Sequence, residues 1–130
     1  MDSDELLNFS NKIFETLGPG YKEHLYVNAM TIHLREKNYL FATEVIVPIE
    51  YNGIQIGFTR ADIVIYKPFK CVLEFKAQST PVSKKEFTQL NQYLVNLKYN
   101  NGILINFGNV LEFHTVDLNE NKKKIIKIEL

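Results

Sequence analysis

The spacing of apolar residues predicts two amphipathic helices at the start of the chain. Over residues 4–17 the apolar side chains recur three and four positions apart, which is the spacing of one helix face. Gly18-Pro19-Gly20 ends this helix, because proline lacks an amide donor and glycine permits a sharp turn. A second helix is predicted beyond that corner, over about 21–37.

The middle of the chain predicts β-hairpins. Asn52-Gly53 is a strong two-residue hairpin signal because both residues tolerate positive φ, and Lys67-Pro68-Phe69 closes a second predicted hairpin. The four strands of these hairpins are predicted at 42–51, 54–58, 60–66 and 70–77.

A third helix is predicted over 84–98, since Ser83 and Glu86 have the spacing of a capping box. Three further strands follow, at 103–107, 110–116 and, as an edge strand, 124–128. The element order predicts one α+β domain over residues 1–130, in which helices flank a mixed central sheet.

Composition narrows the function classes. The 130 residues contain 15 Lys+Arg and 15 Asp+Glu, so no general basic coat is available for gripping nucleic acid, although a local basic patch is compatible with zero net charge. A single cysteine, an acidic start and the lack of a long apolar run indicate an intracellular protein, cytoplasmic or nuclear, without membrane association.

The predicted hairpin 60–77 carries the candidate chemistry. In its second strand Glu74 and Lys76 share one face, while the odd positions are apolar. A register that pairs Tyr66 with Lys70 makes every inward pair apolar and places Asp62 opposite Glu74. Two facing carboxylates destabilise a sheet unless a cation lies between them, and Mg²⁺ prefers one or two carboxylates plus waters.

Simpler interpretations exist for each of these residues. Glu74 and Lys76 can form a surface pair on a solvated face, together with Asp62. Glu23 continues the apolar stripe of the second helix, which is unfavourable without a partner, but an acidic residue also suits a helix N-terminus. Gln89 and Tyr93 share one side of the third helix and can instead be a solvated polar flank.

Several segments of the chain recur together, in the same order, in one known family. They are Leu17–Tyr26, Arg60-Ala61-Asp62, Glu74-Phe75-Lys76-Ala77, Thr80-Pro81-Val82, Gln89-Leu90, Tyr93-Leu94 and Leu104–Gly108. On these segments the chain resembles the GxxExxY proteins of the PD-(D/E)xK nuclease superfamily over roughly residues 9–116. Phe14 stands where that family often has histidine.

The resemblance implies a restriction-endonuclease-like core and Mg²⁺-dependent hydrolysis of phosphodiesters, with Mn²⁺ as an alternative ion. It implies that Asp62 and Glu74 are metal ligands, that Glu23 completes the metal site and that Lys76 is the catalytic lysine. Gln89 and Tyr93 match positions that line the same site.

The expected partner is nucleic acid, with DNA favoured over RNA, and a homodimer is expected because one small domain covers little duplex. The alternative is a catalytically silent module of the same fold that binds nucleic acid or a protein. Zero net charge favours this alternative, or a nuclease whose affinity comes from a protein partner.

Overall fold

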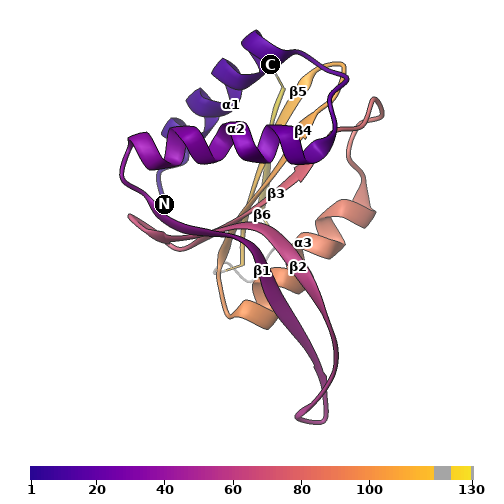
Figure 1. Cartoon of the computed structure of the whole chain (residues 1–130). Helices are drawn as coiled ribbons and strands as arrows, with labels where there is room; N and C mark the ends of the chain where they lie inside the picture. The colour runs from indigo at the N-terminus through magenta and orange to yellow at the C-terminus, as the bar shows by residue number, and fades with distance from the viewer. Residues whose placement is uncertain (119–123, 130) are drawn as a thin grey trace.

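The structure is a computed structural model that describes residues 1–118 and 124–129 (Figure 1). Within these residues none of the helices is long and apolar enough to cross a membrane. The elements are α1 (Asp4–Leu17), α2 (Glu23–Glu36), β1 (Leu40–Tyr51), β2 (Ile54–Lys67), β3 (Cys71–Lys76), α3 (Lys84–Leu97), β4 (Asn101–Phe107), β5 (Leu111–Asp117) and β6 (Lys124–Glu129).

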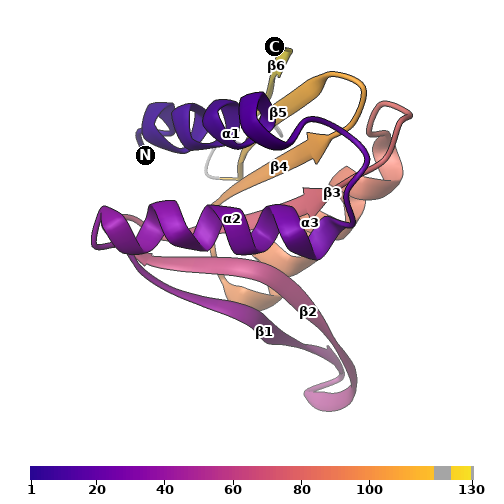
Figure 2. The same ribbon diagram turned by 45° about the horizontal axis from the view of Figure 1, so that its top comes forward.

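One sheet runs through the molecule in the order β1-β2-β3-β4-β5-β6. Strands β3 and β4 are parallel, because α3 carries the chain back between them, and the other neighbours are antiparallel. Helices α1 and α2 cover one face, and α3 covers the other (Figures 1 and 2). The predicted α+β fold with a mixed sheet flanked by helices is therefore confirmed.

Each face of the sheet has its own apolar core. The core beneath α1 and α2 receives the odd positions of β3, whereas the α3 core contains Val72 and Leu104 from the even positions of β3 and β4. Glu74 lies on this second face and is only 4% exposed. The alternative of a solvated face for Glu74 is therefore wrong, because α3 covers it.

The predicted hairpins are present, but two of their strands form one. Residues 54–58 and 60–66 belong to a single strand, β2, because Thr59 offers no turn signal and β2 pairs with β1 along its whole length. The register of the second hairpin is confirmed where the structure pairs Ile63 with Leu73 and Ile65 with Cys71.

Gly108, in the turn between β4 and β5, lies directly against the segment that links β3 to α3. A Cβ atom at Gly108 would be 2.3 Å from the carbonyl oxygen of Gln78 and 3.1 Å from Nδ2 of Asn106. The first distance is too short for any real contact, so only glycine allows this segment to pack here.

Gly108→Ala is expected to lower the free energy of unfolding by roughly 1–3 kcal/mol, as overpacking does, because the backbone at Gln78 must move. Gly57→Ala is the matched control, since a Cβ there meets no atom within 4 Å and its stability should be unchanged or slightly raised. Urea unfolding of both variants measures the difference. Equal free energies of unfolding for Gly108→Ala and Gly57→Ala would contradict this expectation, because the backbone at Gln78 would then move without cost.

Candidate active site

The hydrogen-bond ladder between β2 and β3 stops at Asp62, and side chains replace it. The last paired residues are Ile63 and Leu73. Beyond them Oδ2 of Asp62 accepts a bond of 2.8 Å from the amide of Phe75, and Oε1 of Glu74 accepts one of 3.3 Å from the amide of Asp62. The predicted juxtaposition of Asp62 and Glu74 is present, but through these exchanged bonds rather than a regular strand pair.

A buried carboxylate, that of Glu74, lies beside the half-buried carboxylate of Asp62. Burial raises the pKa of Glu74 to about 9, and the charge and side-chain hydrogen bond of Asp62 contribute to the rise. Burial also raises the pKa of Asp62, against the bonds from Glu74 and Phe75 that lower it. In the absence of a cation this pair therefore holds a proton at neutral pH.

Strand β1 brings a further carboxylate that the sequence did not reveal. Thr43 pairs with Ile63 and Val45 with Ala61, but Glu44 between them has a left-handed backbone with φ +51°. At this point the side chains change faces, so that Ala61 joins the α3 core while Ile63 joins the other core. The predicted register, in which Ala61 would pair with Phe75, is therefore wrong beyond Ile63 and Leu73.

Glu44, Asp62 and Glu23 line one hollow of about 250 Å³. His24 lines the same hollow. Burial raises the pKa of Glu23, the charge of Asp62 raises it further, and Lys76 lowers it.

Glu23 is positioned by the turn before α2. The hydroxyl of Tyr26 donates a 2.6 Å bond to the carbonyl of Gly18 and accepts one of 3.2 Å from the amide of Tyr21. The ring of Tyr26 stacks on Phe107 with centroids 4.3 Å apart. The Gly-Pro-Gly turn is thus tied to the sheet, and Glu23 follows it as the first residue of α2.

Helix α3 supplies the partners of Lys76. Nζ of Lys76 donates a 3.2 Å bond to Oε1 of Gln89. Tyr93 is buried one turn further along, and its hydroxyl lies 3.3 Å from Oγ1 of Thr59. Burial raises the pKa of Tyr93, the bond with Thr59 lowers it, and the charges of Glu74 and Asp62 raise it.

A buried polar network fixes the segment between Lys76 and α3. Asn106, which pairs with Lys76 across β3 and β4, bonds through Oδ1 to the amide of Gln78 (3.0 Å) and through Nδ2 to Glu112 (2.7 Å). Glu112 also accepts bonds from the amide of Val82 (3.2 Å) and from Nε2 of His114 (3.2 Å). The segment that joins Lys76 to Gln89 is therefore held at both ends.

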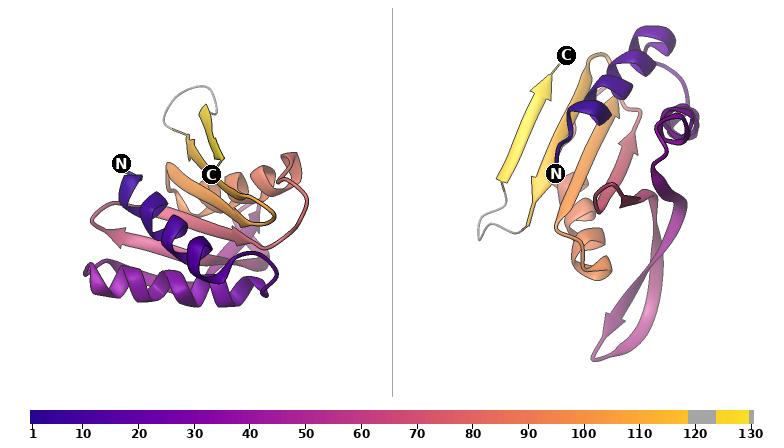
Figure 3. Two further views of the ribbon diagram at one scale, coloured as in Figure 1. Left: turned by 90° about the horizontal axis from the view of Figure 1, so that it is seen from above. Right: turned by 90° about the vertical axis from the view of Figure 1, so that its left-hand side faces the viewer.

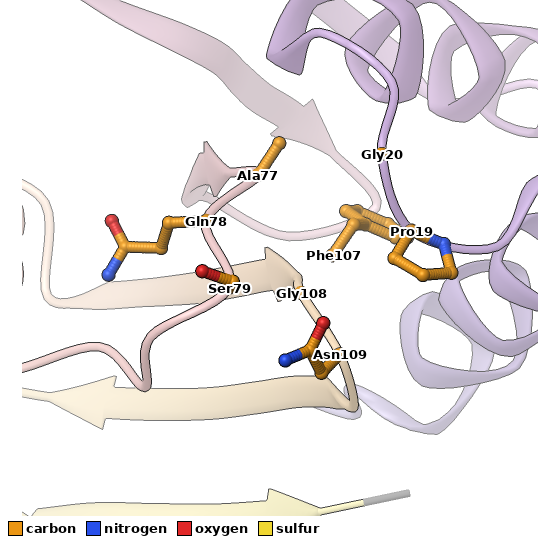
Figure 4. A pocket seen from close by; sticks show the side chains of 8 residues that line it. All are labelled: Pro19, Gly20, Ala77, Gln78, Ser79, Phe107, Gly108 and Asn109. Atoms are coloured by element: carbon orange, nitrogen blue, oxygen red, sulfur yellow. The ribbon is translucent and has the colours of Figure 1, made fainter.

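Two further hollows open near Lys76. One of about 520 Å³ is mainly polar and is lined by Lys76, Gln78, Lys85, Glu86, Thr88, Gln89 and Gln92. The other, of about 360 Å³, lies between the Gly-Pro-Gly turn and the ends of β3 and β4 (Figure 4). It is lined by Pro19, Gly20, Ala77, Gln78, Ser79, Phe107, Gly108 and Asn109, none of which supplies an acid or base.

The donors present suit a hard divalent cation at Asp62 and Glu74. The raised pKa of Glu74 shows that two negative charges are unfavourable here, and a bound cation would neutralise that charge; Mg²⁺ needs only one or two carboxylates in addition to waters. Within the described part of the chain, no three acidic, His or Cys side chains are close enough to form one ligand group. The structure places Glu23 in the same hollow as Asp62, and its part in a metal site stays a prediction.

The chain matches a known family over most of its length. The family model described as the PD-(D/E)XK nuclease superfamily matches residues 2–117. No curated protein and no solved structure matches the chain.

The raised pKa of Glu74 predicts a pH-dependent stability in the absence of metal. The folded protein binds this proton more tightly than the unfolded chain, so the free energy of unfolding should fall as the pH rises from about 4.5 to about 9. Glu74→Gln removes the group that must take up a proton on folding, and it should be more stable than the wild type at pH 8 by at least ~1.4 kcal/mol, the equivalent of one pKa unit.

Urea unfolding in EDTA at several pH values tests this expectation. Glu36→Gln, an exposed site in α2, is the matched control and should keep the wild-type slope. Parallel slopes for the wild type and Glu74→Gln would contradict the assignment of the proton to this pair.

Proposed function

This chain belongs to the PD-(D/E)XK nuclease superfamily, and we propose that it is a metal-dependent nuclease that hydrolyses phosphodiester bonds. The observation that carries the proposal is the pairing of the buried carboxylate of Glu74 with the half-buried carboxylate of Asp62. Their arrangement interrupts the sheet and raises the pKa of Glu74, both of which are unfavourable for a purely structural role.

Each residue has a separable task in the proposed reaction. Asp62 and Glu74 hold the cation, which when bound supplies positive charge at the phosphate and lowers the pKa of a water. Lys76, oriented by Gln89, places its ammonium group where negative charge grows on the phosphate. Glu23 adds negative charge at the rim of the carboxylate pair, and Tyr93 closes the site on the α3 side.

The hollow along α3 suits the nucleic-acid strand. It begins at Lys76 and continues to Lys85, and its other polar groups include the amides of Gln89 and Gln92. Amide and ammonium groups are the donors that proteins direct at phosphate oxygens. DNA is proposed as the substrate, with Mg²⁺ or Mn²⁺ as the ion.

Cleavage assays on labelled single-stranded, duplex and branched DNA, and on RNA, test the proposal. The wild type should cut at least one of these with Mg²⁺ or Mn²⁺ and not with EDTA. Asp62→Asn, Glu74→Ala and Lys76→Ala should each lose at least about 100-fold in kcat, the loss typical of removing one group that stabilises transition-state charge.

Glu36→Gln should retain full cleavage, and circular dichroism should establish that each variant is folded. The same residual cleavage in the wild type and all three site variants would identify contamination. Metal-independent binding that Glu74→Ala leaves unchanged, without cleavage, would instead support the silent binding module.

Metal binding has its own readout. Saturating Mg²⁺ should raise the Tm, because a ligand at 100 times its Kd stabilises the folded state by about 2.7 kcal/mol. The rise should be absent in Asp62→Asn and retained in Lys76→Ala, whose carboxylates are intact. An equal rise in Asp62→Asn would place the ion elsewhere.

A further inference from the structure

The ends of β1 and β2 form an arm that extends beyond the helices. The arm, residues 46–60, is a two-stranded ribbon closed by Asn52-Gly53, and it projects from the rest of the fold (Figure 3). Only its base is covered, where Val47 joins the α3 core and Thr59 contacts Tyr93. A ribbon of two strands is at best marginally stable in water without further packing.

The surface of the arm is apolar. Its large side chains are between 37% and 68% exposed, and they are Ile46, Ile49, Tyr51, Ile54, Ile56 and Phe58. The register puts Ile46 and Phe58 on one face of the ribbon and Tyr51 and Ile54 on the other, so at roughly 100 Å² for each side chain no more than about 300 Å² lies on either face. An exposed apolar patch of a few hundred Å² on a monomer is often a functional surface.

The charges of the arm select its partner. Between residues 46 and 60 the only charged side chains are Glu50 and Arg60, so the arm lacks the cations that a phosphate backbone requires. The chain has zero net charge, and two copies therefore approach without overall repulsion.

Glu50 and Arg60 lie on one face, at opposite ends of the arm. The guanidinium of Arg60 lies 5.5 Å from the ring centroid of Phe58, and the register puts Ile46 and Pro48 opposite these two residues. Alternation along β1 places Glu50 on the same face, and the register places it about 13 Å from Arg60, four residues along the strand. Glu50 and Arg60 therefore cannot pair within one chain.

We propose that the arm is the contact between two copies of this chain, packed face to face and antiparallel around a two-fold axis. The tip of each arm then meets the base of the other, so that Glu50 of one copy pairs with Arg60 of the second. Pro48 and Phe58 occupy the centre, and Ile46 lies beside Arg60 at each end. Such a contact is self-complementary, as two-fold symmetry requires.

This assembly would also join two candidate active sites. Arg60 is two residues from Asp62, and Glu44 is two residues from Ile46 at the base of the arm. The tip of the partner arm therefore lies beside the carboxylates of each copy. The contact itself does not depend on catalysis.

Sedimentation velocity and light scattering, without metal or nucleic acid, should detect a dimer whose fraction rises with concentration. Phe58→Lys should weaken it at least about 10-fold, as expected for a central aromatic anchor. Val95→Lys is the matched control, because Val95 is 65% exposed on α3 and lies outside the arm. It should leave the dimer unchanged.

A charge exchange tests the orientation. Glu50→Arg and Arg60→Glu should each weaken the dimer several-fold, and the double variant should regain most of the loss, because the pair is rebuilt with its signs exchanged. A monomer at every concentration, or a dimer that all arm variants leave unchanged, would overturn the proposal. A monomer whose oligonucleotide binding is lost in Phe58→Lys would overturn it in favour of nucleic acid.

Discussion

The fold accommodates two acidic side chains inside a sheet, and the site depends on how it does so. Where β2 and β3 stop pairing, Asp62 and Glu74 each accept a backbone amide that the ladder no longer satisfies. A regular sheet would leave both carboxylates desolvated and opposed, with nothing to offset their repulsion. The exchanged bonds satisfy the backbone amides of Asp62 and Phe75, and they also hold the two carboxylates close together.

The surroundings of this pair are built from segments far apart in the chain. Tyr26 ties the turn before Glu23 to the sheet, and Gln89 on α3 orients Lys76. The carboxylate of Glu112 stands away from the site, yet it receives three donors and so fixes the connection between Lys76 and α3. Glu112 therefore has a structural role, because its carboxylate is fully hydrogen-bonded. The negative charge at Asp62 and Glu74, by contrast, is only partly offset by Lys76.

The sequence predicted the elements, the mixed sheet and the register as far as Ile63 and Leu73, because apolar pairing on a buried face determines these. The sequence missed Glu44 for a reason of register. The two-residue turn at Asn52-Gly53 sets one register between β1 and β2, but an irregularity between Ile49 and Glu50 shifts that register by one residue. That irregularity sets Glu44 against Asp62. The bonds of Asn106 and Glu112 were also missed, since their partners lie up to 30 residues away along the chain.

The contact of Gly108 with Gln78 limits how this domain can change. The connection from β3 to α3 lies partly at the surface, and such connections usually tolerate insertions. Here the backbone of the connection contacts Gly108 and bonds to the buried side chains of Asn106 and Glu112. A longer connection would therefore displace both Lys76 before it and Gln89 after it. Changes meant to alter substrate preference are therefore better made as side-chain substitutions on the exposed side of α3, because these leave the catalytic framework in place.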